Sequence, residues 1–234
     1  MDSICRKAFE NFYQTKIDDN AVLPLGINIG EYKKNDHKRS EKFVILTICR
    51  YEFPYKGYLL GLIQQFGELC DRYDNLELQI IGWGEGEKRV CHEILQLRDD
   101  KQERIKLIGR VDYELLEDYL KEADVYVGMG TTLLDAGKMG IPAIAVDFFT
   151  EQSVSDQLLC DNAEVVARTH RVMTSELLEQ VINYSDEEYE KCCYKTYLTV
   201  KERYSLDGVM ERIFGYDYSK KQYRMSKLEL WFHI

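Results

Sequence analysis

Two cations and a glycine-rich helix start are the residues in this sequence best suited to hold a negatively charged group. Arg50 and Lys56 bracket a short loop after an apolar stretch, and Gly130, Thr131 and Thr132 stand at the start of a helix-like segment. The first amide groups of a helix have no internal partner and attract anions, phosphate above all. Charge-assisted hydrogen bonds from fixed cations would strengthen as negative charge grows on a departing diphosphate. The pattern predicts a clamp for a diphosphate leaving group.

A structural explanation also exists for these residues. Glu52 is close enough to Arg50 for a weak surface pair, which would leave Lys56 simply solvated. Glycines and cations follow other apolar stretches as well, and the candidates are Gly82 and Gly84, then Gly109, Arg110 and Val111, then Gly128 and Met129. One glycine after a strand is usually a turn, but several such ends at one edge of a sheet favour a binding site.

The elements that must position these residues alternate along the chain. Apolar stretches without polar alternation predict strands over 43–49, 76–83, 104–111, 124–129 and 142–149. Segments with helical spacing separate them, over 56–73, 87–100, 113–123 and 131–140. Strands buried on both faces and joined by helices form a parallel sheet, because each helix packs back onto it. The sequence therefore predicts an α/β fold, a doubly wound parallel sheet of the Rossmann-like kind.

Composition and motif absences narrow the function classes. The net charge of −10, from 31 basic and 41 acidic residues, disfavours nucleic acid as a partner. No G-x-G-x-x-G follows the first strand and no G-K-S or G-K-T loop is present, which disfavours a dinucleotide site and a P-loop. The seven cysteines are scattered without a C-x-x-C pair, so free thiols in a reducing compartment are expected. The four histidines are far apart, so no metal site is expected. No cofactor is expected either.

The motifs at the strand ends, taken together, resemble those of the retaining glycosyltransferases of family 4. The resemblance is to the C-terminal, nucleotide-sugar-binding half of their two-domain GT-B fold, and it runs from "VLPLGINI" (22–29) to "ERYSLDGVMERIF" (202–214). Between these segments, four stretches match the family's pattern in order: "CRYEFPYKG", "IIGWGEG", "IKLIGRV" and "VGMGTTLLDAGKMGIPAI". The resemblance implies transfer of a sugar from a nucleotide-diphosphate donor, without a metal, in polysaccharide or glycoconjugate assembly.

The resemblance also implies roles for individual residues. Arg50 and Lys56 would be catalytic, holding the donor diphosphate with help from the amides near Thr131 and Thr132. Asp135 stands where the family's glutamate binds the ribose, and the segment 109–111 would border the base. The chain departs from the pattern at two places. Asp135 is one methylene shorter than glutamate, and Val127 replaces a glutamate that contacts the donor sugar, although valine cannot hydrogen-bond a hydroxyl.

The expected domain organisation follows from the same resemblance. Residues 24–216 would form the nucleotide-sugar-binding domain and 217–234 a C-terminal tail. Residues 1–23 would be a linker or the remnant of an acceptor domain, because domains rarely have fewer than about 50 residues. A separate polypeptide carrying the acceptor domain is therefore an expected partner. The stretch 173–204 is predicted to be helical and to cover the sheet, with Ser185 as a helix cap.

The sequence says less about the cellular compartment and about the C-terminal tail, residues 217–234. No apolar run approaches the ~20 residues needed to span a bilayer, and the N-terminus lacks the apolar block of a signal peptide. The cytoplasm is the expected compartment, with peripheral contact at the inner membrane face as a further expectation. The basic and aromatic tail leaves three explanations open: docking on another domain, contact with an anionic membrane surface, or fraying.

Three hypotheses about function survive, from different classes. The first is the donor-binding domain of a glycosyltransferase. The second is a non-catalytic module that binds a nucleotide sugar, which Val127 favours. The third is an unrelated doubly wound enzyme, such as an epimerase of nucleotide sugars or an NAD-dependent oxidoreductase, which the missing glycine-rich turn after the first strand disfavours.

Overall fold

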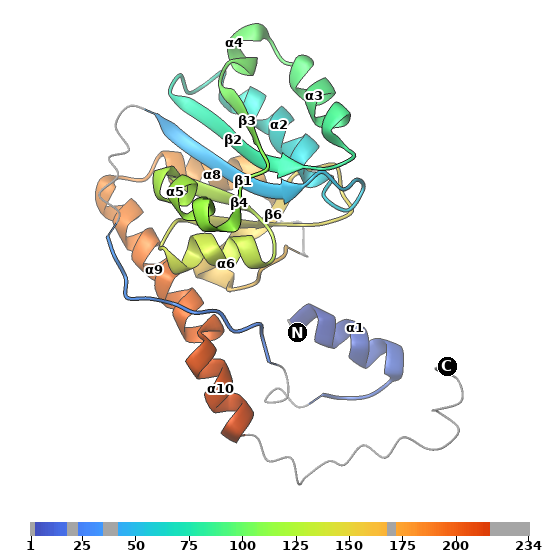
Figure 1. Cartoon of the computed structure of the whole chain (residues 1–234), viewed down its shortest axis with the longest axis vertical. Helices are drawn as coiled ribbons and strands as arrows, with labels where there is room; N and C mark the ends of the chain where they lie inside the picture. The colour runs from blue at the N-terminus through green and yellow to red at the C-terminus, as the bar shows by residue number, and fades with distance from the viewer. Residues whose placement is uncertain (1–2, 18–22, 35–41, 168–171, 216–234) are drawn as a thin grey trace. The chain divides into compact units, whose positions relative to one another are not determined.

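The computed structural model of the chain describes residues 3–17, 23–34, 42–167 and 172–215 (Figure 1). The chain divides into two compact units, of which the larger, here called the core unit, is Ile27–Ser205. The smaller unit combines Met1–Gly26 with Leu206–Ile234 and contains helices α1 (Ser3–Tyr13) and α10 (Leu206–Gly215). The boundaries expected after residues 23 and 216 stay predictions, and the tail 217–234 lies outside the described residues.

The core unit is built on one sheet with the strand order β3-β2-β1-β4-β5-β6-β7. The five parallel strands are β1 (Phe43–Arg50), β2 (Leu76–Trp83), β3 (Ile105–Gly109), β4 (Val125–Gly128) and β5 (Ala143–Val146). They confirm the five strands predicted from the sequence, although the third and fifth end earlier than expected. The sheet continues with two antiparallel strands that the sequence did not predict, β6 (Val154–Leu158) and β7 (Val172–Met173).

Helices cover the sheet on both faces, as expected for a doubly wound fold (Figure 1). One face carries α2 (Tyr58–Leu69), α3 (Glu87–Leu95) and α8 (Thr174–Ile182), whose apolar side chains join a first core cluster. The other face carries α5 (Leu116–Glu122), α6 (Thr131–Lys138) and part of α9 (Asp186–Tyr204), which join a second cluster. The short segments are α4 (Asp99–Gln102), the 3₁₀ turn η2 (Tyr113–Leu115) and α7 (Leu159–Asn162).

The central strand β1 shows why an apolar run without polar alternation predicts a strand that is buried on both faces. Seven of its eight residues are buried, with only Arg50 exposed. Ile45 packs into the first core cluster and its neighbour Leu46 into the second, because successive side chains of a strand point to opposite faces. Alternate positions of the run therefore pack against the helices on opposite faces of the sheet, so all of them are buried. Arg50 is exposed because the strand leaves the core there.

The order of the strands creates a switch point between β1 and β4. These strands are neighbours, with Ile45 paired to Val125 and Leu46 to Tyr126. The chain leaves β1 toward α2 on one face and leaves β4 toward α6 on the opposite face. In such sheets, ligands bind beyond the carboxyl ends of the strands at this reversal. We call this part of the molecule the carboxyl edge.

The C-terminal helical stretch confirms both the predicted helices and the predicted cap. The segment 173–204 is two helices, α8 and α9, because the chain breaks at 183–185. Ser185 caps α9, since its Oγ accepts a hydrogen bond from the amide of Glu188 at 3.3 Å. The Glu188 carboxylate accepts in return from the amide of Ser185 at 2.8 Å, which completes a capping box.

Candidate functional site

Arg50 is the last residue of β1, and its side chain is 66% exposed at the carboxyl edge. Its Nη1 lies 3.5 Å from Oε1 of Glu52, so the surface pair considered from the sequence is present. The Glu52 side chain is itself 53% exposed, and pairs as exposed as this one contribute little free energy. The guanidinium also lies 5.8 Å from the ring centroid of Trp83 on the adjacent strand. Arg50 is therefore positioned at the edge without being strongly neutralised.

Lys56 follows Arg50 at the start of the segment that leads into α2, and it is half-buried. Burial lowers the pKa of its ammonium group, an effect that Cys49 and Glu52 oppose. The Nζ lies 5.0 Å from the ring centroid of Tyr55. A half-buried cation is stabilised by a nearby negative charge, because that charge offsets the desolvation cost. Lys56 is thus more than a solvated surface lysine.

The start of α6 lies beside the end of β1. Tyr126 of β4 donates a hydrogen bond to Oγ1 of Thr132 at 2.6 Å, and the same hydroxyl lies 3.4 Å from the carbonyl oxygen of Ile48 in β1. Thr132 is the second residue of α6, and Ile48 is two residues before Arg50. This contact brings the first turn of α6, with Thr131 at its start, to the strand end that carries Arg50.

Two glycines shape the turn between β4 and α6. Gly130 has φ +72° and ψ −139°, a conformation that is essentially limited to glycine, and its amide donates to the carbonyl of Val165 at 2.8 Å. Gly128 is needed for another reason, because a Cβ there would come 2.6 Å from the Tyr126 hydroxyl. Met129, between them, is buried in the first core cluster. These residues position the turn, and contact with a ligand stays a prediction for all three.

The glycines after β2 have a packing explanation. A Cβ on Gly82 would overlap the ring of Tyr51 and come 2.5 Å from the carbonyl of Cys49. Gly84 has φ +141°, and a Cβ there would come 3.1 Å from the backbone of Tyr51. Both glycines therefore let the loop after β1 lie against the end of β2. Whether they also contact a ligand is untested.

Trp83, between these glycines, lies beside two candidate residues of the carboxyl edge, and the sequence analysis did not single it out. Its ring lies near Arg50, and the guanidinium of Arg110 lies 5.3 Å from the same ring centroid. Gly109, which ends β3 with φ +81°, turns the chain toward Arg110, and Val111 packs against the second core cluster. The Gly-Trp-Gly sequence, between two strand ends that carry arginine, was the available signal.

Asp135 lies in α6, and two neighbours already hold its carboxylate. Oδ1 accepts from Nζ of Lys138 at 2.7 Å and from the hydroxyl of Tyr113 at 3.2 Å. Burial alone would lower the pKa of Lys138, but the hydrogen bond to Asp135 and the negative charges around the ammonium group together outweigh it and raise that pKa above 10.5. Because Tyr113 belongs to η2, the segment after β3 and helix α6 meet at this carboxylate. Asp135 is 14% exposed in its side chain.

Val127 stands where the resemblance places a sugar-binding glutamate, and the structure buries it completely. Its side chain belongs to the first core cluster, together with α2 residues such as Ile63. The residue therefore supplies packing to the core and no hydrogen bond to a ligand. This position is where the chain departs most clearly from the expected site.

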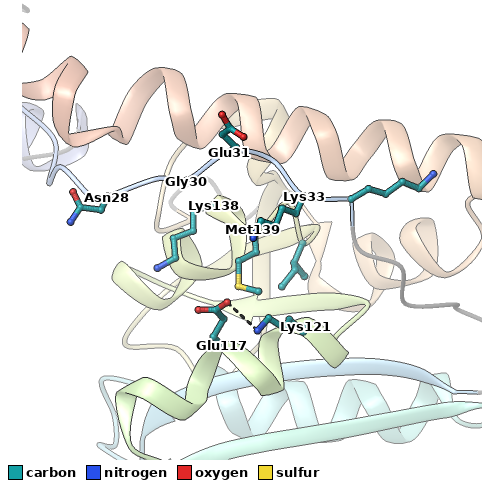
Figure 2. Close-up of a pocket in the computed structure, with 10 residues that line it drawn as sticks. Asn28, Gly30, Glu31, Lys33, Glu117, Lys121, Lys138 and Met139 are labelled. Carbon is teal, nitrogen blue, oxygen red and sulfur yellow. Dashed lines mark ion pairs between the residues drawn. The ribbon is translucent and has the colours of Figure 1, made fainter.

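A pocket of about 390 Å³ lies on the α5 and α6 side of the core unit (Figure 2). Its lining residues are Asn28, Gly30, Glu31, Lys33, Lys34, Glu117, Lys121, Lys138, Met139 and Ile141. Glu117 and Lys121 form an ion pair of 3.1 Å along α5 on one side of it, and Lys34 pairs with Glu190 at 2.7 Å. Lys138 joins this pocket to Asp135. The acidic neighbours balance the lysines, so the pocket is not a cationic site.

The structure brings most predicted residues to one part of the molecule. Arg50, Lys56, Thr131 and Thr132 lie at the carboxyl edge around the switch point. Arg110 joins them through Trp83. Asp135 lies further along α6 and meets the segment after β3. Two cations beside a helix start can bind a diphosphate, which is the chemistry predicted from these residue types.

Six cysteines among the described residues are free thiols, as predicted, and they are Cys49, Cys70, Cys91, Cys160, Cys192 and Cys193. In the part of the chain that the structure covers, no helix combines the length and apolar character needed to cross a membrane.

Comparison with known proteins identifies the family. The family model for glycosyl transferases group 1 matches residues 28–197, most of the chain. A human protein named as a subunit of phosphatidylinositol N-acetylglucosaminyltransferase is 28% identical over 123 residues, which are 52% of this chain and 24% of that protein. The GPI3 subunit of the enzyme of that name from Saccharomyces cerevisiae is 23% identical over 193 residues, covering 71% of this chain and 42% of the relative. The chain thus spans less than half the length of these relatives.

Solved structures show the same fold. A mutant of TarM from S. aureus, solved with fondaparinux, alpha-GlcNAc-glycerol and UDP, matches with a TM-score of 0.67 at 16% identity, over 92% of this chain and 42% of that one. The lipopolysaccharide outer core galactosyltransferase WaaB matches with a TM-score of 0.61 at 15% identity, over 91% of this chain and 59% of that one. The neighbours are GT-B glycosyltransferases, and the mixed α/β sheet is shared with them. With the family model covering residues 28–197, the chain belongs to the glycosyl transferases group 1 family.

Proposed function

We propose that the chain is the donor-binding, C-terminal part of a family 4 glycosyltransferase and that it transfers a sugar with retention. The observation that carries the proposal is that Tyr126 joins Thr132, at the start of α6, to Ile48, near the end of the strand that carries Arg50. The donor is a nucleotide-diphosphate sugar. The half-buried Lys56 supplies the second cation.

The proposed reaction exchanges one bond at the anomeric carbon for another. The bond from that carbon to the donor diphosphate breaks, and an acceptor hydroxyl bonds to the same carbon on the same face. The acceptor proton leaves with the diphosphate. Arg50 and Lys56 stabilise the charge that grows on the departing diphosphate, and the amides at the start of α6 add donors. Removing one such donor in other enzymes costs about 10²–10³ in turnover. No metal is required in this proposal.

The relatives supply the first substrates to test. Because the curated relatives are named as phosphatidylinositol N-acetylglucosaminyltransferase subunits, we propose an N-acetylglucosamine donor and a lipid-linked inositol acceptor in glycoconjugate assembly. UDP is the nucleotide in the TarM structure. Since the relatives are subunits, a partner polypeptide is proposed here as well. A cytoplasmic location at a membrane surface stays a prediction.

The test is release of UDP from UDP-N-acetylglucosamine in the presence of phosphatidylinositol vesicles, with the full chain and a candidate partner polypeptide. The Arg50→Ala, Lys56→Ala double variant is expected to lose at least about 100-fold in rate. The matched control is Arg98→Ala, Lys106→Ala, which removes the same charge from exposed residues near the opposite end of the sheet. Equal losses in the two double variants would contradict the proposed site.

A second candidate function is a non-catalytic module that binds a nucleotide sugar. Two observations favour it: Val127 is buried in the core, and the carboxylate of Asp135 is held by Lys138 and Tyr113. In that case UDP binds in the same place, but no variant or partner yields UDP release above the rate without protein. Binding with turnover excludes the module, and binding without turnover supports it.

A further inference from the structure

Three neighbouring strands deliver two arginines and a tryptophan to the carboxyl edge. Arg50 ends β1, Trp83 ends β2 directly opposite it in the parallel register, and Arg110 follows β3. Both guanidinium groups lie near the Trp83 ring, at 5.8 Å for Arg50 and 5.3 Å for Arg110. One aromatic ring therefore lies in contact with two cations.

Arg50 and Trp83 point to the face of the sheet that α6 covers. Ile48 and Ile81, two residues earlier on the same strands, both belong to the second core cluster, as does Leu133 of α6. Side chains two residues apart on a strand share a face. The ring therefore holds Arg50 on the side where α6 begins.

Trp83 is itself firmly held. Its carbonyl accepts a hydrogen bond from the amide of Tyr51 at 2.8 Å, and the glycines on either side leave room for Tyr51. The indole is half-buried and stands on the last position of a strand, whose ladder to β1 runs along its full length. A ring with this support can position a mobile guanidinium.

The ring holds an arginine in a different way from a carboxylate. Glu52 attracts Arg50 only weakly and offsets a small part of its charge, whereas an aromatic face attracts a guanidinium and leaves the positive charge intact. Within the part of the chain that the structure describes, Arg110 has no carboxylate ion-pair partner. Lys56 repeats the arrangement over Tyr55. The three cations near the switch point therefore contact aromatic rings that leave their charge available for an anion.

We propose that Trp83 is a positioning residue for the donor diphosphate, which holds Arg50 and Arg110 together as two guanidinium ligands for it. This inference rests on the proposed function, because it concerns the same edge and the same diphosphate. It extends the clamp from two cations to three. It also gives Arg110 a role toward the diphosphate in addition to the segment's expected place beside the base.

The test compares UDP affinity, by titration calorimetry of the full chain, among wild type, Trp83→Leu and Trp83→Phe. Trp83→Leu, which removes the aromatic face, is expected to weaken UDP binding about three- to tenfold. Trp83→Phe keeps an aromatic face and is expected to stay within about twofold of wild type. Equal affinities of Trp83→Leu and wild type overturn the inference while leaving the proposed function intact. Absence of UDP binding by the wild type contradicts both.

Phe53→Leu is the matched control. Arg89 lies 5.3 Å from the Phe53 ring centroid, but its charge is already paired with Glu151 at 2.6 Å. This variant removes an arginine–aromatic contact of the same length without changing Arg50 or Arg110. Wild-type affinity in Phe53→Leu is expected. A loss as large as that of Trp83→Leu would mean that general loosening of the loop causes both effects, and it overturns the inference.

A spectroscopic measurement covers the case in which Trp83→Leu does not fold. The chain has two tryptophans, so Trp231→Phe leaves Trp83 as the only one. Its emission is expected to change with UDP to saturation, at the same dissociation constant that calorimetry gives. Adding Arg50→Ala and Arg110→Ala to this background is expected to alter the emission without UDP. An emission that responds neither to UDP nor to these substitutions overturns the inference.

Discussion

The hydroxyl of Tyr126 donates a hydrogen bond to Oγ1 of Thr132 at 2.6 Å, which ties the start of α6 to the strand before it. The same hydroxyl lies 3.4 Å from the carbonyl of Ile48, so one phenol links β4, α6 and β1 at the switch point. Tyr126 is completely buried, and Gly128 leaves room for its ring. The relative placement of Arg50 and the helix start depends on this contact.

Tyr126→Phe is expected to destabilise the chain by about 1–2 kcal/mol, because it removes a buried hydrogen bond and leaves Thr132 with a weaker partner. Urea unfolding followed by circular dichroism measures this. Tyr194→Phe, an exposed tyrosine of α9, serves as the control and is expected to change stability by less than about 0.5 kcal/mol. Equal stability of the two variants would show that the Tyr126 hydroxyl does not hold the switch point.

Gly130→Ala is expected to cost about 1–3 kcal/mol, because φ +72° with ψ −139° is strained for any residue with a Cβ. No heavy atom lies within 4 Å of the added Cβ, so the cost comes from the backbone alone. Gly30→Ala also meets no atom within 4 Å and has no positive φ, which makes it the control. Stability unchanged in both variants, again from urea unfolding, would argue against the described turn.

The Lys138–Asp135 pair gives a prediction about alkaline pH. Burial opposes the charged form of Lys138, but the hydrogen bond and the charge of Asp135, with smaller electrostatic contributions, raise its pKa above the ordinary 10.5, so the folded state binds this proton more tightly than the unfolded state. The stabilisation is then fully present below about 10.5 and is lost as pH rises through the folded pKa. The difference in unfolding free energy between wild type and Lys138→Met is expected to be constant from pH 7 to 9 and to shrink above 10.5. A difference that grows with pH would contradict the pair.

The pKa of Lys56 is shifted in the opposite direction, and it gives a prediction about UDP affinity. Burial lowers its pKa, so the ammonium group loses its proton below 10.5. UDP affinity of the wild type is expected to fall as pH rises through that lowered pKa. Lys56→Arg keeps its charge over the same range, so its UDP affinity is expected to fall less. Ionisation of UDP itself affects both proteins equally and cancels in the comparison. Identical pH profiles from calorimetry between pH 7 and 10.5 would exclude Lys56 as a ligand of the diphosphate.

Val127→Glu tests the departure from the family's pattern. A carboxylate at a completely buried position among α2 side chains has no charge partner in the first core cluster. We expect loss of several kcal/mol of stability and no gain in UDP release, because burial of an unpaired charge is costly. Thermal unfolding measures the first effect. A variant as stable as wild type with higher turnover would mean that position 127 faces the donor sugar.

The sequence predicted the five parallel strands from their apolar residues, most clearly in β1, where all positions but the last are buried. The signal is weaker in the edge strand β3, where Lys106 and Leu107 are exposed. It did not predict β6 and β7. The residues of β6, "VSDQL", mix polar and apolar side chains, and β7 has only two residues, so neither carries a clear periodic signal. These strands form through pairing with β5 and with each other, which is tertiary information.

The candidate site, like the fold, could be predicted from the sequence only in part. Arg50, Lys56 and the start of α6 carry local signals, and the strand order brings them to one edge. Lys138 lies three residues after Asp135, so that pair was readable from helical spacing. Tyr113 is 22 residues away from Asp135, and the contact of Trp83 with two arginines depends on strand register, so neither contact could be read locally.

Titration calorimetry with UDP tests the central claim most directly, by comparing wild type with Arg50→Ala, Lys56→Ala and with the control Arg98→Ala, Lys106→Ala. Both variants lose two positive charges, so bulk electrostatics is matched. The account predicts saturable binding to wild type and to the control, and a loss of at least about tenfold in the Arg50, Lys56 variant. Equal affinity of all three proteins, or no binding of UDP to any of them, would contradict it.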